Sequence, residues 1–268
     1  MSKNKDTIGS TIFIIVVLCF VCSIVVSATA VLLKPMQQDN VRIDKMQYIL
    51  EGAGFDADVT DGKPNVALLN RQQIQETYSR YIETKVIDLA TGQYDLSIDP
   101  ETYDIKKAMR DKTLSVEAKQ DFAKVRRVPK KAFVYLVKDD ENQIENVIIP
   151  IQGTGLWSMM YAYVALEKDL NTIKSLVYYE QAETAGLGAE VQNPTWQKKW
   201  HGKKIYNSEG EVALRISKSP ADVATHYGVD AIAGATLTGD GVNNSFKFWF
   251  GDEGYKPYLT LRRQEGLL

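Results

Sequence analysis

The chain has 268 residues, of which 44% are hydrophobic and 25% charged, and its formal net charge at pH 7 is -2. This length can bury one large core or two small ones. The near-neutral charge excludes strong electrostatic attraction to nucleic acid, so we expect no nucleic-acid partner. The basic cluster KVRRVPKK, residues 124–131, is interpreted as a solvated loop, with docking to a partner protein as the alternative.

The N-terminal region is strongly apolar. No charged residue occurs from Thr7 to Leu33, and about 20 apolar residues suffice for a helix to cross a bilayer. The small residues SATA at 27–30 resemble a cleavage site, but the apolar run is longer than the roughly 7–15 residues of a signal peptide. We therefore expect a retained transmembrane helix over residues 7–33. Lys3 and Lys5 favour a cytoplasmic tail, residues 1–6, with the rest of the chain outside the cytoplasm.

The two cysteines, Cys19 and Cys22, both lie inside the predicted span. Ser23 follows where a c-type haem motif has His, so the pair is interpreted as small apolar packing residues. Contact with a metal held by partner chains stays open. Outside the span the only imidazoles are His201 and His226, so no zinc site built on Cys and His is expected.

Beyond the span, periodicity predicts mixed secondary structure. The expected fold class is α+β: a largely antiparallel sheet with flanking helices after the single N-terminal transmembrane helix. We divide the exported part into a membrane-proximal helical or α+β region, 34–130, and a second domain, 131–268. The predicted helices are 36–55, 67–89, a short one around Trp196 and Trp200, and an aromatic one at 242–250; the predicted strands are 94–100, 132–139, 143–151, 155–169, one within 169–184, and 211–218.

The segment DAIAGATLTGDGV, residues 230–242, precedes the aromatic helix. Its glycines at 234, 239 and 241 allow backbone N–H groups to approach a phosphate, and the helix would add its positive end. Neither the P-loop lysine nor the Rossmann glycine pattern is present. The alternative is a tight loop that caps the helix through Thr238 or Asp240.

DAIAGAT, residues 230–236, resembles the flavinylation motif of proteins that carry FMN covalently: Asp, two variable residues, Ser or Thr, Gly, Ala, then Ser or Thr. The resemblance implies that a flavin transferase joins the FMN phosphate to the Thr236 hydroxyl through a phosphoester, and that the transferase recognises Asp230. Position 233 is Ala where the family usually has Ser or Thr, and Thr238 is the alternative acceptor.

Three further stretches, GLWSMMYAYVALEKD, YYEQAETAGLGAEVQNPTWQKKW and TGDGVNNSFKFWF, resemble the C subunit of the sodium-pumping NADH:quinone oxidoreductase. This resemblance implies an FMN-binding domain at 131–268 on the periplasmic side of a bacterial inner membrane. Electrons would pass from an iron–sulfur centre at the D and E subunits to the flavin of the B subunit. The complex assembled with the A, B, D, E and F subunits would oxidise NADH, reduce ubiquinone and translocate sodium, without independent substrate turnover by this chain.

The same resemblance implies which side chains surround the flavin. Glu183 could instead be a solvated strand end and Trp157 a core aromatic. Two rivals remain: the G subunit of the related Rnf ferredoxin:NAD complex, and a membrane-tethered non-redox binding or sensor domain. The implied cofactor-binding residues are Leu156, Trp157, Ser158, Glu183, Thr184, Leu187, Gly188, Gly234, Ala235, Thr236, Leu237 and Thr238.

Overall fold

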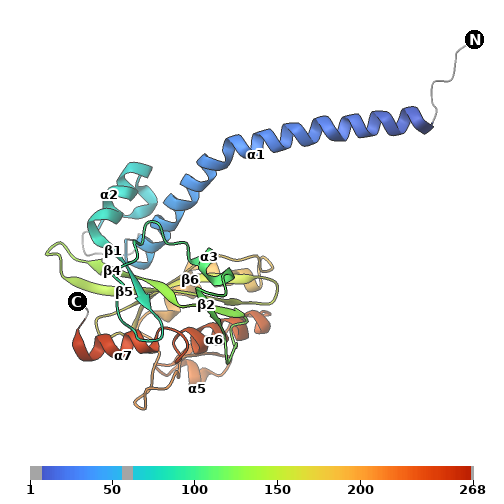
Figure 1. Cartoon of the computed structure of the whole chain (residues 1–268). Coiled ribbons are helices and arrows are strands. Elements are labelled where there is room, and N and C mark those ends of the chain that lie inside the picture. The colour runs from blue at the N-terminus through green and yellow to red at the C-terminus, as the bar shows by residue number, and fades with distance from the viewer. Residues whose placement is uncertain (1–7, 56–62, 267–268) are drawn as a thin grey trace, which may run out of the picture. The chain divides into compact units, whose positions relative to one another are not determined.

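The structure is a computed structural model that describes residues 8–55 and 63–266. The chain divides into two compact units, Met1–Lys45 and Met46–Leu268. The predicted tail, residues 1–6, lies outside the described residues. Helix α1, Ile8–Gly52, contains the apolar segment and is long and apolar enough to cross a membrane (Figure 1).

The apolar part of α1 satisfies its own polar side chains. The hydroxyls of Ser23 and Thr29 donate to the carbonyls of Cys19 and Val25, one turn earlier, at 2.7 and 2.8 Å. Because these polar groups are paired within the helix, they impose little penalty on a lipid-facing surface.

The second unit is built on one five-stranded sheet in the order β1-β4-β5-β6-β7, and every neighbouring pair is antiparallel. The expected antiparallel sheet is thus confirmed. Strands from both sides of residue 130 belong to it, because β1 pairs with β4. The strands are β1 Ile82–Asp88, β4 Lys131–Lys138, β5 Ile144–Thr154, β6 Met159–Leu166 and β7 Ile173–Glu180.

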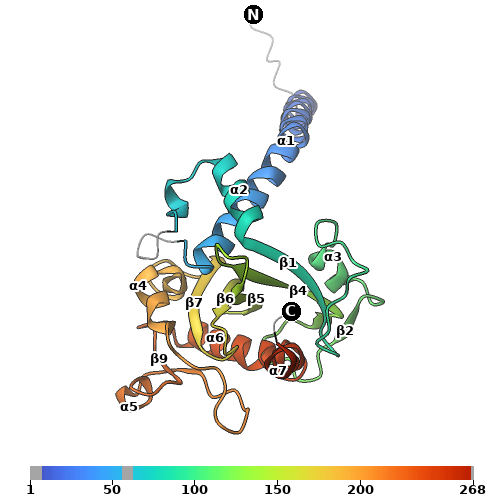
Figure 2. The same ribbon diagram turned by 90° about the vertical axis from the view of Figure 1, so that its left-hand side faces the viewer.

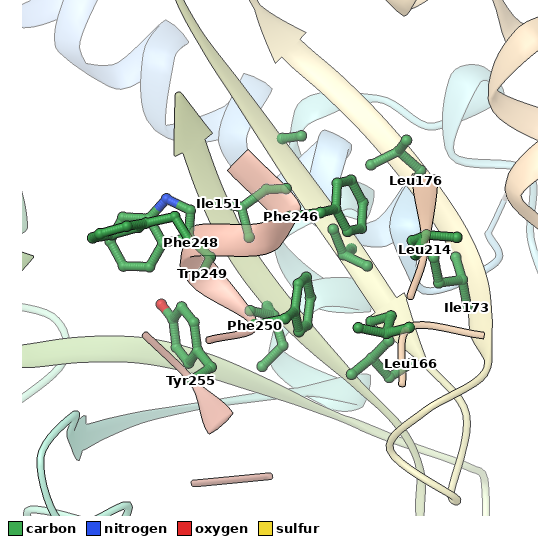
Figure 3. Packing of buried hydrophobic residues seen from close by; sticks show 14 of the residues in the cluster. Ile151, Leu166, Ile173, Leu176, Leu214, Phe246, Phe248, Trp249, Phe250 and Tyr255 are labelled. Atoms are coloured by element: carbon green, nitrogen blue, oxygen red, sulfur yellow. The ribbon is translucent and has the colours of Figure 1, made fainter. Parts of the chain in front are cut away.

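Both faces of the central strands are covered. On one face lie α6, Thr236–Trp249, and α7, Lys256–Glu265 (Figure 2). Aromatic rings fill this layer: Phe246 stacks on Trp200 at 4.8 Å and on Phe250 at 5.5 Å between ring centroids (Figure 3). On the other face the last turn of α1 packs, and the Ser175 hydroxyl donates to the carbonyl of Gly52 at 2.6 Å. The core therefore fixes α6 against β5, which positions the segment before α6.

Short elements complete this unit. Two small sheets lie beside the large one: β2 pairs antiparallel with β3, and β8 pairs parallel with β9. The short helices are α3 Ile105–Arg110, α4 Pro194–Gln197, α5 Pro220–Val223 and the 3-10 turns Val66–Leu68, Gly188–Gln192 and Lys198–Trp200; the short strands are β2 Ser115–Glu117, β3 Arg127–Pro129, β8 Arg215–Ser217 and β9 Gly228–Asp230.

The predicted helix at 67–89 is wrong in its second half. Helix α2, Arg71–Tyr81, begins at a capping box in which Asn70 and Gln73 bond each other's backbone N–H. It ends before the β-branched residues of β1, which pair with β4 instead. Tertiary pairing therefore overrides the helical periodicity of this segment.

Three other expectations need correction. Residues 94–100 form turns, because the Asp95 carboxylate accepts the backbone N–H of Ser97 at 3.0 Å. Of the strand predicted at 211–218, only β8 forms. The basic cluster at 124–131 is not fully solvated, since Val125 and Val128 are buried.

Candidate functional site

Thr236 is the first residue of α6, so the helix begins six residues before the predicted start at 242. Gly234 turns the chain with a φ of +73°, a conformation that side chains other than glycine rarely adopt. Ala235 is the N-cap and supplies no side-chain hydrogen bond, and the first turn contains no acidic residue. The expectation that Thr238 or Asp240 caps the helix is therefore wrong. The positive end of α6 lies at an exposed hydroxyl.

Glu183 connects three segments that are distant in sequence. Its Oε1 accepts the backbone N–H of Trp157 at 2.9 Å and of Ser158 at 3.0 Å. Its Oε2 accepts the N–H of Leu156 at 3.1 Å and the hydroxyl of Thr238 at 2.8 Å. The side chain is buried, so it is not the solvated strand end that remained an alternative.

These contacts set the charge state of Glu183. Burial by itself raises the pKa of the carboxyl, whereas the N–H of Trp157, the hydroxyl of Thr238 and the N–H groups of Leu156 and Ser158 lower it. The hydrogen bonds prevail, and the pKa lies below its usual value of 4.5. Glu183 is therefore a carboxylate at neutral pH and an acceptor for all of these donors.

Glycines permit the close packing around this carboxylate. A Cβ added to Gly155 would lie 2.6 Å from Oε1 of Glu183, and one added to Gly188 would lie 2.5 Å from Oγ1 of Thr238. At Gly241, a Cβ would meet the carbonyl oxygen of Thr154 at 2.4 Å. The start of α6 thus lies directly against the end of β5.

Large apolar side chains remain exposed around Thr236. Trp157 is 70% and Leu237 59% exposed, and Leu156 and Leu187 are also exposed. Trp157 is therefore not the core aromatic that remained an alternative. Leu187 lies close to the motif, since a Cβ at Gly234 would be 2.8 Å from its Cδ2. Exposed apolar groups clustered at a polar loop are typical of a binding surface.

Two lysines lie at the motif. Lys199 Nζ pairs with the carboxylate of the exposed Asp230 at 2.7 Å, and the indole N–H of Trp196 donates to the Asp230 carbonyl at 2.9 Å. Lys218 Nζ donates to the Thr236 hydroxyl oxygen at 2.8 Å. Neither lysine was expected from the sequence, which gives no signal for a contact between segments 18 or more residues apart.

The structure brings the residues expected around the flavin together. The segments 156–158, 183–188 and 234–238 meet at Glu183 and Leu187, and the exposed Thr184 accepts the N–H of Leu187 at 3.1 Å through its carbonyl. A separate surface pocket of about 560 Å³, lined by residues that include Ile144, Lys168 and Arg263, lies at the opposite end of β5. At the candidate site itself, the apolar side chains of Leu156, Trp157, Leu187 and Leu237 are exposed on the surface.

Comparison with known proteins agrees with this location. Residues 155–251 match the FMN-binding domain family. The chain is 46% identical to the C subunit of the Na(+)-translocating NADH-quinone reductase of Haemophilus ducreyi, over 96% of this chain and 95% of that protein. It is 42% identical to the protein of the same name from Vibrio parahaemolyticus, over the full length of both.

Solved structures give the same result. The crystal structure of NqrC from Shewanella oneidensis superimposes with a TM-score of 0.73 at 35% identity, covering 83% of this chain and 98% of that one. The chain therefore belongs to the family of C subunits of the Na(+)-translocating NADH-quinone reductase, an oxidoreductase complex to which these proteins contribute an FMN-binding domain.

Proposed function

We propose that this chain carries FMN as a phosphoester on Thr236 and relays electrons within the membrane complex. The single observation that carries the proposal is the exposed Thr236 hydroxyl at the uncapped start of α6, within a flavinylation-like motif. N–H groups at a helix start favour an anion such as a phosphate. The residues present therefore fit the phosphate end of FMN.

The environment favours Thr236 over Thr238 as the acceptor. Thr238 is 2% exposed, and its hydroxyl already donates to Glu183. A transferase can reach the Thr236 hydroxyl without disturbing the fold. Ala233 is exposed, so the hydroxyl that the flavinylation motif usually has at this position would add a contact for the transferase and not a core interaction. Asp230, also exposed, is the residue we expect the transferase to recognise.

The exposed apolar side chains suit the ring system of a flavin. Trp157, Leu156 and Leu187 lie on the loops that Glu183 joins, and Leu237 follows the acceptor. Aromatic and aliphatic groups can cover a ring face, and fixed backbone N–H groups tune its electronics. Bound FMN would supply the redox chemistry, accepting and donating single electrons. Glu183 would act by holding the 156–158 loop in place.

The proposed electron relay rests on the resemblance to the family of C subunits. We infer that electrons arrive from an iron–sulfur centre at the D and E subunits and leave to the flavin of the B subunit, with A and F completing the complex. The exported unit would face the periplasm, anchored in the inner membrane by α1. The names of the relatives in Haemophilus ducreyi and Vibrio parahaemolyticus support this complex rather than the Rnf complex.

The test is covalent flavin on the denatured chain. We expect the chain, co-expressed with a flavin transferase, to fluoresce in a denaturing gel, and mass mapping of residues 230–247 to locate one FMN phosphoester on Thr236. Thr236→Ala should be dark, whereas Thr238→Ala, the matched control, should keep its flavin. Flavin retained by Thr236→Ala would refute the assignment of the acceptor, and a colourless wild-type chain would favour a non-redox sensor domain.

A further inference from the structure

Lys218 is an exposed cation without a carboxylate partner in the described part of the chain. Its Nζ donates to Oγ1 of Thr236 at 2.8 Å. Its basic neighbours differ: Lys199 pairs with Asp230, and Arg215 pairs with Asp222, each at 2.7 Å. Among these three basic residues, Lys218 is the one with no ion pair to a carboxylate of the described residues.

The backbone places Lys218 firmly beside the motif. Residue Ser217, at the end of β8, pairs with Asp230 in the parallel ladder, and its carbonyl accepts the N–H of Ala231 at 3.1 Å. On the other side, Asn243 of α6 accepts the N–H of Ile216 at 2.7 Å through its side-chain oxygen. Because β8 is bonded both to the motif and to the helix that Thr236 begins, the root of the Lys218 side chain is fixed relative to the acceptor.

We propose that Lys218 orients the Thr236 hydroxyl for flavin attachment and then serves as counter-ion to the FMN phosphodiester. This inference rests on the proposed function. In the attachment step Oγ1 of Thr236 bonds to the phosphorus of the FMN phosphoryl group, the phosphoanhydride bond of a flavin dinucleotide donor breaks with the nucleotide monophosphate as leaving group, and the hydroxyl proton passes to a base of the transferase. The ammonium group of Lys218 occupies one lone pair of Oγ1 before attachment, so the second lone pair has a fixed direction toward the phosphorus. After attachment, the phosphodiester keeps one negative charge at neutral pH, within reach of Nζ. A compact ammonium group on a flexible stem can follow the oxygen from hydroxyl to phosphate.

A purely structural role for Lys218 predicts a different result. The side chain is exposed, and loss of an exposed polar contact has little effect on the free energy of unfolding. Flavin attachment, in contrast, depends on the charge at this position. Attachment and stability can therefore be measured as independent effects of the same substitution.

The experiment follows attachment in the full chain. Wild-type, Lys218→Met, Lys218→Arg and Lys218→Glu chains are incubated with a limiting amount of flavin transferase and its flavin donor, and in-gel fluorescence is followed over time. We expect the initial rate of attachment to fall about tenfold in Lys218→Met, which corresponds to an increase of about 1.4 kcal/mol in the activation free energy. The rate should fall further in Lys218→Glu and stay within about twofold of the wild-type rate in Lys218→Arg. All variants should keep the wild-type melting temperature.

Lys168→Met is the matched control, because Lys168 is also exposed and follows β6 at its far end, roughly 25 Å along the strand. It should attach flavin at the wild-type rate. The ³¹P resonance of the attached phosphodiester should shift between wild type and Lys218→Met. An unchanged rate in Lys218→Met, or a lowered melting temperature that Arg does not rescue, would overturn the role of Lys218, whereas flavin on Thr236→Ala would overturn the proposed function itself.

Discussion

Replacing Glu183 by glutamine removes one acceptor oxygen from a cluster of buried and part-buried donors. The carboxylate receives Trp157 N–H, Ser158 N–H and the Ser158 hydroxyl on Oε1, and Leu156 N–H and the Thr238 hydroxyl on Oε2. The glutamine amide has only one oxygen, and this oxygen can accept the three donors that Oε1 accepts in the wild type. Its NH₂ then faces the Leu156 N–H, donor against donor, while the Thr238 hydroxyl can rotate to accept.

The energetic cost follows from this count. Leaving the part-buried N–H of Leu156 unpaired costs up to about 1–3 kcal/mol, and the remaining hydrogen bonds weaken because their acceptor is no longer charged. We expect Glu183→Gln to lower the free energy of unfolding by about 2–4 kcal/mol, or the melting temperature by roughly 4–16 °C for a domain of this size. Glu180→Gln is the control, since Glu180 is exposed and 3.7 Å from Lys106, and should change stability by less than about 0.5 kcal/mol.

The difference in stability between wild type and Glu183→Gln should depend on pH. The pKa of Glu183 is depressed in the folded state from 4.5, so the folded state binds fewer protons than the unfolded chain. The stabilisation is therefore complete above pH 4.5 and declines as pH falls through the lowered folded-state pKa. Thermal melts of wild type and Glu183→Gln should converge over that acidic range. Equal melting temperatures for Glu183→Gln and Glu180→Gln at neutral pH would refute the reasoning.

Two further predictions concern the same region. Gly241→Ala should lower the melting temperature by several degrees, because its Cβ would lie 2.4 Å from the Thr154 carbonyl oxygen and push α6 away from β5, at a cost of about 1–3 kcal/mol. The control is Gly210→Ala, whose Cβ meets no atom but whose φ is +76°. Comparing the thermal melts of the two variants separates steric crowding from backbone strain. Trp157→Ala should leave the melting temperature unchanged, because this indole is 70% exposed, yet increase the fluorescence of attached flavin if the indole covers the ring; unchanged emission would argue that Trp157 lies off the ring.

The sequence was sufficient to predict four of the five strands of the central sheet, because each of these strands has a local sequence signal. The β4 to β7 segments are long apolar runs separated by turn residues, and adjacent antiparallel strands pair with short connections. The β1 segment was missed, since its partner β4 lies more than 40 residues away. Local periodicity carries no information about such a pairing.

The candidate site likewise has some features with a local sequence signal and others that depend on contacts between distant segments. The motif around Thr236 is contiguous and could be found by resemblance. The start of α6 could not be located, because Ala235 is a poor N-cap and tertiary contacts, such as the packing of Gly241 against Thr154, fix the helix there. The contacts of Lys218 and Asn243 join separate segments of the fold and have no local signature.

The carboxylate of Glu183 also affects how the loop beside Thr236 responds to changes in charge. The N–H dipoles of Leu156, Trp157 and Ser158 are already held by a fixed negative charge, so they cannot swing toward a neighbouring group that gains an electron. Such a preorganised environment relaxes little when the charge beside it changes. In the proposed electron relay, this rigidity would keep the contribution of the 156–158 backbone to the reorganisation energy small.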